Sequence, residues 1–161
     1  MFSESFNHRL LCEMYKDGAI VQRALPRVRS LLSHGLSLEQ ALIGTGLMRP
    51  EAYGSFLSQA FGVPFVRVTS DREGGDALLS AAIQRALEAV IISRHGDHCV
   101  VAMTHPNAER LNILQQCARE GGWIAEPRVM LRSDWLARQE HSLTKTGLPS
   151  INHLECHGVR V

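Results

Sequence analysis

The spacing of apolar residues changes at Pro64, and this change limits the possible folds of the 161-residue chain more than any other feature. Before Pro64, as in the segment 53–61, apolar residues recur every three or four positions, which is typical of amphipathic helices. After it, short apolar runs lie between glycines and polar residues, which is typical of strands. We therefore predict an α+β chain, with a helical subdomain over residues 1–62 and a small α+β lobe over residues 63–141.

Turn and cap residues divide the helical subdomain into short helices. Pro26 suits the first turn of a helix, where a missing N–H costs little. Ser37 and Gln40, three residues apart, form the two halves of a capping box for the next helix. Pro50 begins a further helix, and Gly62 ends it because glycine tolerates the left-handed backbone of a helix C-terminus. These signals predict an all-helical subdomain.

Four segments of the second lobe are predicted as strands, which gives a three- to four-stranded sheet. Residues 65–68 form the first. Residues 89–93 and 99–103 are apolar runs joined by a hairpin connection with a glycine near its tip. Residues 123–130 form the last strand, and Pro127 suits an edge of the sheet because proline cannot donate a hydrogen bond to a neighbouring strand.

Three helices are predicted between and after these strands. Asp76 caps the first of them, and Pro106 begins the second, which ends at Gly121. Ser133 caps a short last helix. Residues 142–161 show little periodicity, and we interpret them as a tail or linker.

Composition excludes several functions. Lysine and arginine number 17 and aspartate and glutamate 16, so the formal net charge of +1 gives no field that attracts duplex nucleic acid or an anionic membrane. No run approaches the roughly 20 apolar residues of a membrane-spanning helix. The start of the chain has no basic region followed by an apolar core, as a secretory signal would. The four cysteines form no CxxC pair, so we expect a cytoplasmic protein with free thiols.

The sequence contains no recognisable catalytic constellation. Nothing matches the phosphate-binding loop GxxxxGK followed by Ser or Thr, a GxGxxG after a strand, or the GxSxG nucleophile elbow. His153, Cys156 and His157 lie close together near the C-terminus, and His95 and His98 flank a hairpin turn, but neither group has the ligand spacing of a zinc site. We predict no catalytic residue, no metal site and no cofactor. A metal-dependent enzyme that uses the histidine-rich tail is the least supported alternative.

Basic residues gather in the first two helices, namely Arg9, Arg23, Arg27 and Arg29. Their simplest interpretation is a solvated helix face with few aromatic residues between the charges. A small phosphorylated ligand is the alternative, because one arginine together with the N–H groups of a helix terminus suffices to bind it.

A repeat with an offset of 28 residues runs through the helical subdomain. The aligned residues are Arg9-Leu10, Met14, Gly18 and Leu25 in the first copy, and Ser37-Leu38, Leu42, Gly46 and Tyr53 in the second. Each copy predicts one helix–turn–helix unit, whose glycine permits a tight turn. Chance similarity between two helical hairpins is the alternative.

From Leu31 to Gln139 the chain resembles the N-terminal domain of type II secretion and type IV pilus assembly ATPases. The segment 46–66 is similar to the "GL, helix, LGLPFV" signature of this family, and the segments 89–92 and 100–106 are similar to its "VLPL … VAMADP" hairpin. The resemblance implies a bacterial, non-catalytic interaction and regulatory domain. It also implies a protein partner, the cytoplasmic part of an inner-membrane secretion or pilus platform, through which the domain is held at the membrane.

Some members of this family bind cyclic di-GMP through two consecutive motifs, written RLGxxLxxxGxxxxxxLxxxLxxQ, and the repeat falls on them. The resemblance therefore implies an alternative function, a cyclic di-GMP receptor. Its nucleotide-binding residues would be those at matching or nearly matching positions: Arg9, Leu10, Met14, Gly18, Leu38, Leu42, Gly46 and Leu57.

Seven positions depart from these motifs: Leu11, Arg29, Leu32, Ser37, Glu39, Tyr53 and Ala60. They replace one arginine, two glycines, two glutamines and two leucines. A ligand with two phosphates and two guanines needs cations, amides and closely approachable glycines. Glu39 would bring a like charge to the phosphates, which costs about 4 kcal/mol at about 4 Å in an effective dielectric of about 20. We therefore favour a retained scaffold whose dinucleotide binding is weakened or lost.

Overall fold

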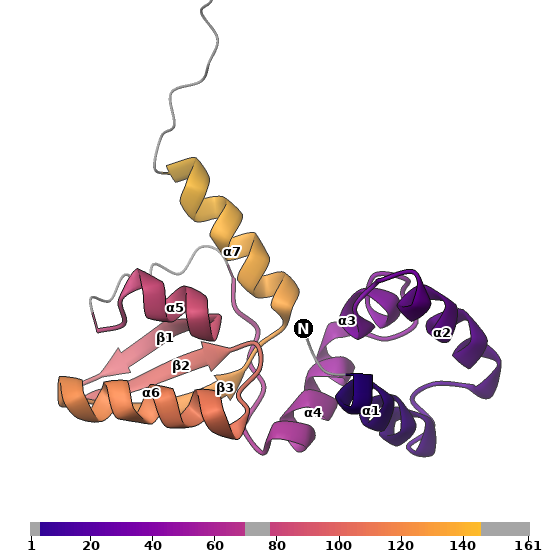
Figure 1. Cartoon of the computed structure of the whole chain (residues 1–161), viewed down its shortest axis with the longest axis horizontal. Helices are drawn as coiled ribbons and strands as arrows, with labels where there is room; N and C mark the ends of the chain where they lie inside the picture. Colours follow the sequence, from indigo (N-terminus) through magenta and orange to yellow (C-terminus); the bar gives the residue numbers. More distant parts are fainter. Residues whose placement is uncertain (1–3, 70–77, 146–161) are drawn as a thin grey trace, which may run out of the picture.

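The structure is a computed structural model that describes residues 4–69 and 78–145, and these form two lobes that lie side by side (Figure 1). The helical lobe contains α1 (Glu4–Lys16), the 3-10 turn η1 (Gln22–Ala24), α2 (Leu25–Ser33), α3 (Leu38–Leu42) and α4 (Pro50–Phe61). The α+β lobe contains α5 (Ala81–Leu87), β1 (Ala89–His95), β2 (His98–Met103), α6 (Ala108–Gly121), β3 (Ile124–Val129) and α7 (Arg132–Lys145). The predicted fold class is confirmed.

Caps and prolines set the helix boundaries in the helical lobe as the sequence predicts. The Ser37 hydroxyl accepts a hydrogen bond from the Gln40 N–H, and the Gln40 side chain accepts one from the Ser37 N–H. Pro26 and Pro50 lie in the first turns of α2 and α4. Gly62, with a φ of 70°, ends α4. The predicted capping box and helix boundaries are therefore confirmed.

The same turn occurs twice in the helical lobe. The Gly18 N–H donates to the Tyr15 carbonyl and the Gly46 N–H to the Ile43 carbonyl, each at 3.0 Å. The two glycines have φ angles of 72° and 73°, and an added Cβ would meet nothing within 4 Å at either position. The left-handed backbone, and not crowding, therefore calls for glycine. The repeat in the sequence is a repeat of local structure.

Buried side chains from the helices of this lobe form its apolar core, among them Met14, Val28 and Leu42. Val129 and Leu131, from the α+β lobe, belong to the same buried cluster. Shared apolar contacts thus join the two lobes, because separating the lobes would expose these side chains to water.

The sheet of the described residues has the strand order β1-β2-β3. β1 and β2 are antiparallel and are joined by a turn that contains Gly96, with a φ of 65°. β3 runs parallel to β2 after a crossover through α6. It lies at an edge of the three-stranded order, where Pro127 removes one hydrogen-bond donor. The predicted hairpin and edge strand are confirmed.

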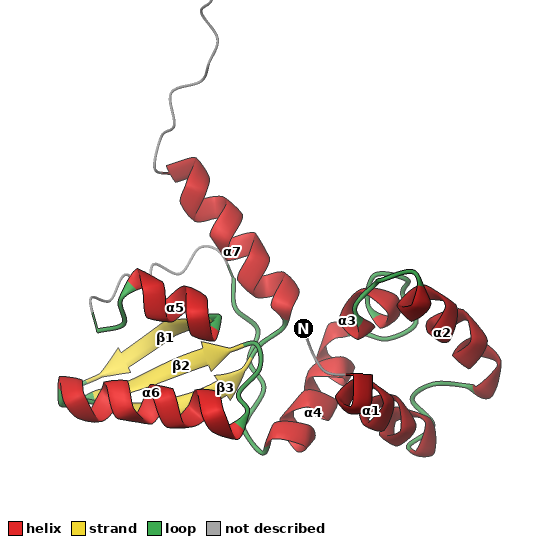
Figure 2. Ribbon diagram, in the orientation of Figure 1, coloured by secondary structure: helices red, strands yellow, loops and turns green. Residues whose placement is uncertain are grey.

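Helices pack on the sheet from both sides (Figure 2). α5 and α6 cover one face of the sheet, where Ile91, Val101 and Leu114 belong to one buried cluster. Val90, next to Ile91 and therefore on the opposite face of the strand, packs with Trp135 of α7. The segment between the lobes contributes Val68 to this second cluster.

Two predicted elements at the start of the α+β lobe need correction. Residues 65–68 form only a single bridge, from Phe65 to Val129. The chain leaves the sheet at this point because the Val68 N–H donates to the Asp134 carboxylate of α7, at 3.1 Å, and not to a strand. The hydroxyl of Ser80 caps α5, whereas Asp76, the predicted cap, lies outside the described residues.

The last helix begins earlier and ends later than predicted. α7 begins at Arg132, so Ser133 lies inside the helix and is not its cap. It continues to Lys145, four residues into the predicted tail. Its outer end has few apolar side chains and Leu143 is 65% exposed, which explains the weak periodicity. Throughout the described part of the chain, no helix has the length and apolar character needed to cross a bilayer.

Candidate functional site in the cleft between the lobes

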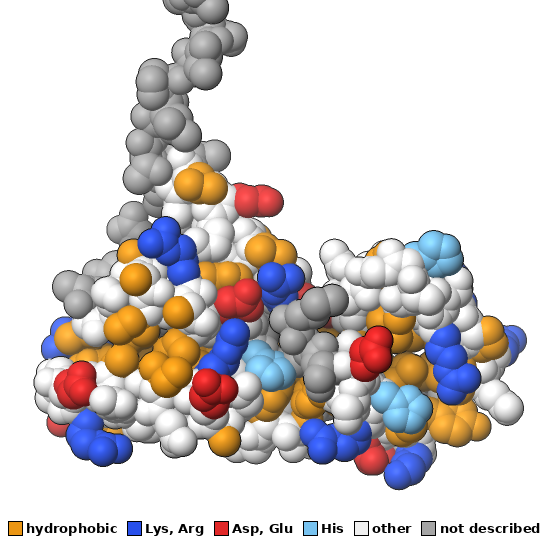
Figure 3. All heavy atoms as spheres, viewed as in Figure 1, with side chains coloured by type: hydrophobic (Ala, Val, Ile, Leu, Met, Phe, Trp, Pro, Cys, Tyr) orange, Lys and Arg blue, Asp and Glu red, His pale blue; other side chains and the backbone are white. Residues whose placement is uncertain are grey.

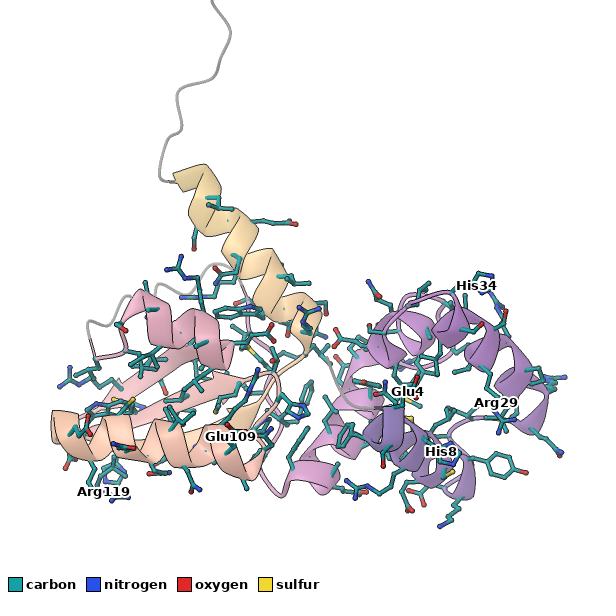
Figure 4. All side chains as sticks on the ribbon, in the orientation of Figure 1. Glu4, His8, Arg29, His34, Glu109 and Arg119 are labelled. Atoms are coloured by element: carbon teal, nitrogen blue, oxygen red, sulfur yellow. The ribbon has the colours of Figure 1, made fainter. Side chains whose placement is uncertain are left out.

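A cleft of about 1070 Å³ lies between the two lobes. On the helical side, Glu4 and His8 of α1 and Arg29 of α2 line it, and Figure 4 shows these side chains on neighbouring helices. On the other side, the α+β lobe contributes Glu88, Thr104, His105, Asn107, Arg110 and Arg132. The cleft therefore combines cations, carboxylates and hydrogen-bonding groups, which suits a polar ligand.

Most residues predicted to bind cyclic di-GMP lie in the core. The apolar ones are at most 4% exposed: Leu10, Met14, Leu38, Leu42 and Leu57. Gly18 and Gly46 form the two equivalent turns. The chain thus matches the motifs mainly at positions that the helical scaffold itself needs.

Arg9, the charged residue among the predicted ones, does not line the cleft between the lobes. Its guanidinium lies over the ring of Phe6, 5.7 Å from the ring centroid. It borders an adjoining depression of about 670 Å³, together with Ala60 and Phe61, and this depression shares His105 and Asn107 with the cleft. The structure therefore does not bring Arg9 together with Arg29.

Five of the seven positions that depart from the motifs line the cleft: Leu11, Arg29, Leu32, Ser37 and Glu39. Leu11 and Leu32 are apolar where the motif has glycine and glutamine. Ser37 stands in place of an arginine. The departures are therefore concentrated where a bound ligand would meet the helical lobe.

Glu39 connects the lobes through the backbone of α7. Its two carboxylate oxygens accept hydrogen bonds from the N–H groups of Arg132, at 3.0 Å, and Ser133, at 2.9 Å. Glu39 is only 8% exposed, and the positive N-terminal end of a helix stabilises a carboxylate. The expectation that Glu39 presents its charge to a ligand is thus corrected, because this carboxylate caps α7. Burial and, to a lesser degree, the charge of Glu39 raise the pKa of Tyr53.

Glu88 lies at the end of α5 with a left-handed backbone, φ 46°, which is uncommon for a residue other than glycine. Its carboxylate accepts a hydrogen bond from the Thr104 hydroxyl and two from the Arg132 guanidinium, each at 3.4 Å. The Arg110 guanidinium donates to the Leu87 carbonyl at 3.2 Å. These contacts fix the α5–β1 corner against β2, α6 and α7 at the wall of the cleft.

Phe6, Phe61 and His105 form an aromatic cluster across the lobes. The rings of Phe6 and Phe61 stack with centroids 5.1 Å apart, and His105 meets Phe61 edge-on at 4.9 Å. Burial, aided by the positive charge of Arg110, lowers the pKa of His105 to about 4. The imidazole is therefore neutral near pH 7 and contributes to the site as an aromatic group rather than a cation.

Arg67 forms a second charged link between the lobes. Its guanidinium donates to Asp134 of α7, with an Nε–Oδ2 distance of 3.0 Å, and to Glu51 of α4 at 3.3 Å. The hydrogen bond with Asp134 is the main cause that raises the pKa of Arg67. The bidentate contact to Asp134 fixes the direction of α7 beside the helical lobe.

Nucleophilic and metal-binding groups are not gathered at the cleft. In residues 4–69 and 78–145, no three His, Cys, Asp or Glu side chains are placed to hold a metal ion. The predicted candidates His153, Cys156 and His157 lie outside this part. The Cys12 Sγ lies 3.7 Å from the Nε2 of His8, one turn earlier on α1. What the described cleft offers is charge and hydrogen bonding.

Comparison with solved structures gives the fold. MshE, in a structure with cyclic di-GMP, matches with a TM-score of 0.55 and 20% identity, over 83% of this chain and 96% of that chain. Two crystal forms of the N-terminal domain of XpsE match with TM-scores of 0.48 and 0.42 at 18% and 16% identity, over 88% of this chain and 98% and 99% of theirs. No protein-family model matches the sequence, and no curated protein does.

This chain has the fold of MshE. The match covers both lobes, so the fold expected from the resemblance to secretion and pilus ATPase N-terminal domains is confirmed. At 20% identity, the match to MshE concerns architecture alone, because one fold carries many functions.

Sequence reasoning missed the half of the site that comes from the α+β lobe. One signal was available: Thr104 and His105 stand where the "VAMADP" hairpin signature has Ala and Asp, and both line the cleft. No local signal marked Arg132, because the Glu39 carboxylate that accepts from its backbone N–H is 93 residues away in the sequence.

Proposed function

We propose that this chain is a non-catalytic protein-interaction and regulatory domain, of the kind found at the N-terminus of bacterial type II secretion and type IV pilus ATPases. It acts in the cytoplasm and docks to a protein partner, the cytoplasmic part of an inner-membrane secretion or pilus platform. The shared fold with MshE and the sequence resemblance support this assignment. Docking requires a complementary surface and no reactive group.

One observation carries the proposal: the Glu39 carboxylate stands where the dinucleotide motif has glycine, and it is bonded to the backbone of α7. A glycine would let a phosphate approach the backbone closely. The glutamate side chain fills that space, and its carboxylate is engaged by the Arg132 and Ser133 N–H groups of α7. With Leu11 and Leu32 on the same wall, the helical side of the cleft has lost groups that a dinucleotide requires, whereas its scaffold is intact.

Complex formation with isolated platform domains tests the proposal. The full chain is mixed with the cytoplasmic domains of inner-membrane platform proteins from the native host, and the mass of each complex is measured by size-exclusion chromatography with light scattering. We expect a stoichiometric complex with one of them. Failure to form a complex with any platform domain at about 100 µM, where interactions of micromolar Kd are nearly saturated, would contradict the proposal.

The second candidate function is a cyclic di-GMP receptor, which the structure of MshE with cyclic di-GMP favours. A cleft of about 1070 Å³ has room for such a ligand, and Arg29 lines it as the phosphate partner in this candidate function. Calorimetric titration distinguishes the candidates. A receptor that uses this cleft binds with a Kd below about 1 mM and loses more affinity in Arg29→Ala than in Arg9→Ala. No heat up to about 1 mM ligand would eliminate the receptor function.

A further inference from the structure

The segment of η1 and α2 carries positive charge that no neighbouring residue in the sequence balances. Between Asp17 and Glu39 there are three arginines and His34 but no acidic residue. Arg23 and Arg27 are both exposed and lie about one helical turn apart. Figure 3 shows basic side chains over α2, at the end of the helical lobe that points away from the α+β lobe.

The arginines of the α+β lobe are used differently. Several are bonded to carboxylates or carbonyl groups within the fold: Arg67, Arg94, Arg110, Arg128 and Arg132. Arg23 and Arg27 make no ion pair and no side-chain hydrogen bond with any described residue. Folding therefore leaves the donors of these two guanidinium groups for another molecule.

Apolar groups lie beside these two charges. Val21, at the start of η1, is 53% exposed, and Pro26 is exposed next to Arg27. We call Val21, Arg23, Pro26 and Arg27 the basic face. Arginine beside apolar surface is typical of protein interfaces, because the apolar groups lose contact with water when a partner covers them.

We propose that the basic face docks the protein partner, and that the docking segment of this partner is an acidic helix with carboxylates about one turn apart. This inference rests on the proposed interaction function and adds the chemistry of the contact. A guanidinium group binds a carboxylate through two parallel hydrogen bonds. Carboxylates four residues apart on a helix have about the same separation as Arg23 and Arg27.

A lipid surface or a nucleic acid fits this face less well. Anionic membranes are recognised by clusters of about four to eight basic residues, and the basic face has two. Single-stranded nucleic acids bind through aromatic side chains on which bases stack. The sequence has no aromatic residue between Gly18 and Ser37.

An NMR titration of the isotope-labelled full chain tests the inference. The probe is a synthetic helical peptide with glutamates four residues apart, and the same peptide with glutamines is the control. We expect saturable amide shifts confined to residues 21–30, and none with the glutamine peptide. The Arg23→Glu/Arg27→Glu variant should raise the Kd about tenfold or more. The matched variant Arg85→Glu/Arg119→Glu changes the net charge equally on α5 and α6, and should leave the Kd within about twofold.

Equal weakening by the two variant pairs would overturn the inference, since net charge alone would then explain binding. Tighter binding to phosphatidylserine vesicles or to a single-stranded oligonucleotide than to the peptide would overturn it too. The platform complex separates the two proposals. If Arg23→Glu/Arg27→Glu forms that complex as well as the unmodified chain does, the basic face is wrong and the interaction function stands. If no platform domain binds, the interaction function is wrong. The peptide titration then still tests whether the basic face binds an acidic helix.

Discussion

At the junction of the two lobes, Arg67 and Arg132 are bonded to carboxylates, whereas in the helical lobe Arg23 and Arg27 are bonded to no carboxylate of the described residues. The difference separates two uses of charge. Charges at the junction hold the lobes and α7 together, while Arg23 of η1 and Arg27 of α2 make no ion pair with any described residue. The dinucleotide motifs divide similarly, because their matching positions mostly form the scaffold and their departures mostly line the cleft.

The largest expected effect tests whether the motif leucines are scaffold. Leu42 is fully buried in the core of the helical lobe. Leu42→Ala should lower the free energy of unfolding by about 3 kcal/mol, because it removes apolar contacts and leaves a cavity. Urea denaturation measures this loss. Leu136→Ala, at a position 45% exposed on α7, should change stability by less than about 0.5 kcal/mol. Equal losses in the free energy of unfolding in the two variants would contradict the assignment of Leu42 to the scaffold.

The next effect concerns the link between the lobes. Glu39→Ala should cost about 2 kcal/mol, because it removes both hydrogen bonds to the first turn of α7. Hydrogen exchange at the amides of Arg132 and Ser133 should become faster in this variant. Glu13, whose bond to Lys16 is on the exposed surface, gives the control, and Glu13→Ala should cost less than about 0.5 kcal/mol. Unchanged exchange at the two amides would show that Glu39 does not fix α7.

A smaller effect sharpens the description of the helical lobe as a repeat. Gly18→Ala and Gly46→Ala each place a Cβ on left-handed backbone, which should cost about 1 to 2 kcal/mol. The two losses, measured by thermal unfolding, should agree within about 0.5 kcal/mol because the turns have the same geometry. A large cost at only one glycine would mean that the two copies are not equivalent.

The smallest effect is a pH dependence from the aromatic cluster between the lobes. The pKa of His105 is lowered from 6.5 to about 4 in the folded chain, so below pH 6.5 the unfolded chain binds the proton more readily. Stability from this residue is complete above pH 6.5 and is lost as the pH falls towards 4. After allowance for solvent screening, the change is about 1 kcal/mol. The urea midpoint is measured at several pH values for the unmodified chain and for His105→Gln. The variant should lack the fall in midpoint between pH 6.5 and pH 4. An identical fall in the variant would show that another residue causes the pH dependence.

Signals close together in the sequence predicted most of the fold. The capping box of Ser37 and Gln40, the proline at position 26 and the turn glycines each act within a few residues, so one short window contains the whole physical cause. What the sequence did not reveal depends on distant partners. The Val68 N–H bonds to Asp134, 66 residues later, and this contact turns a predicted strand away from the sheet.

The candidate site was predictable only in part for the same reason. The motif comparison found positions on the helical wall, such as Ser37 and Glu39, but it could not separate residues of the core from residues of the cleft. That separation depends on where the second lobe packs. The opposite wall, with Glu88 and Arg132, is defined only once the two lobes are in contact.

The anchored start of α7 has a mechanical consequence. This helix has 14 residues, which corresponds to a length of about 21 Å, and its first turn is bonded to α3 through Glu39. The pivot at the first turn of α7 is therefore held in part by a residue of the other lobe. A tilt of about 10° at the pivot displaces the far end by about 4 Å. A shift of the helical lobe relative to the sheet would in this way change the direction of the outer end of α7.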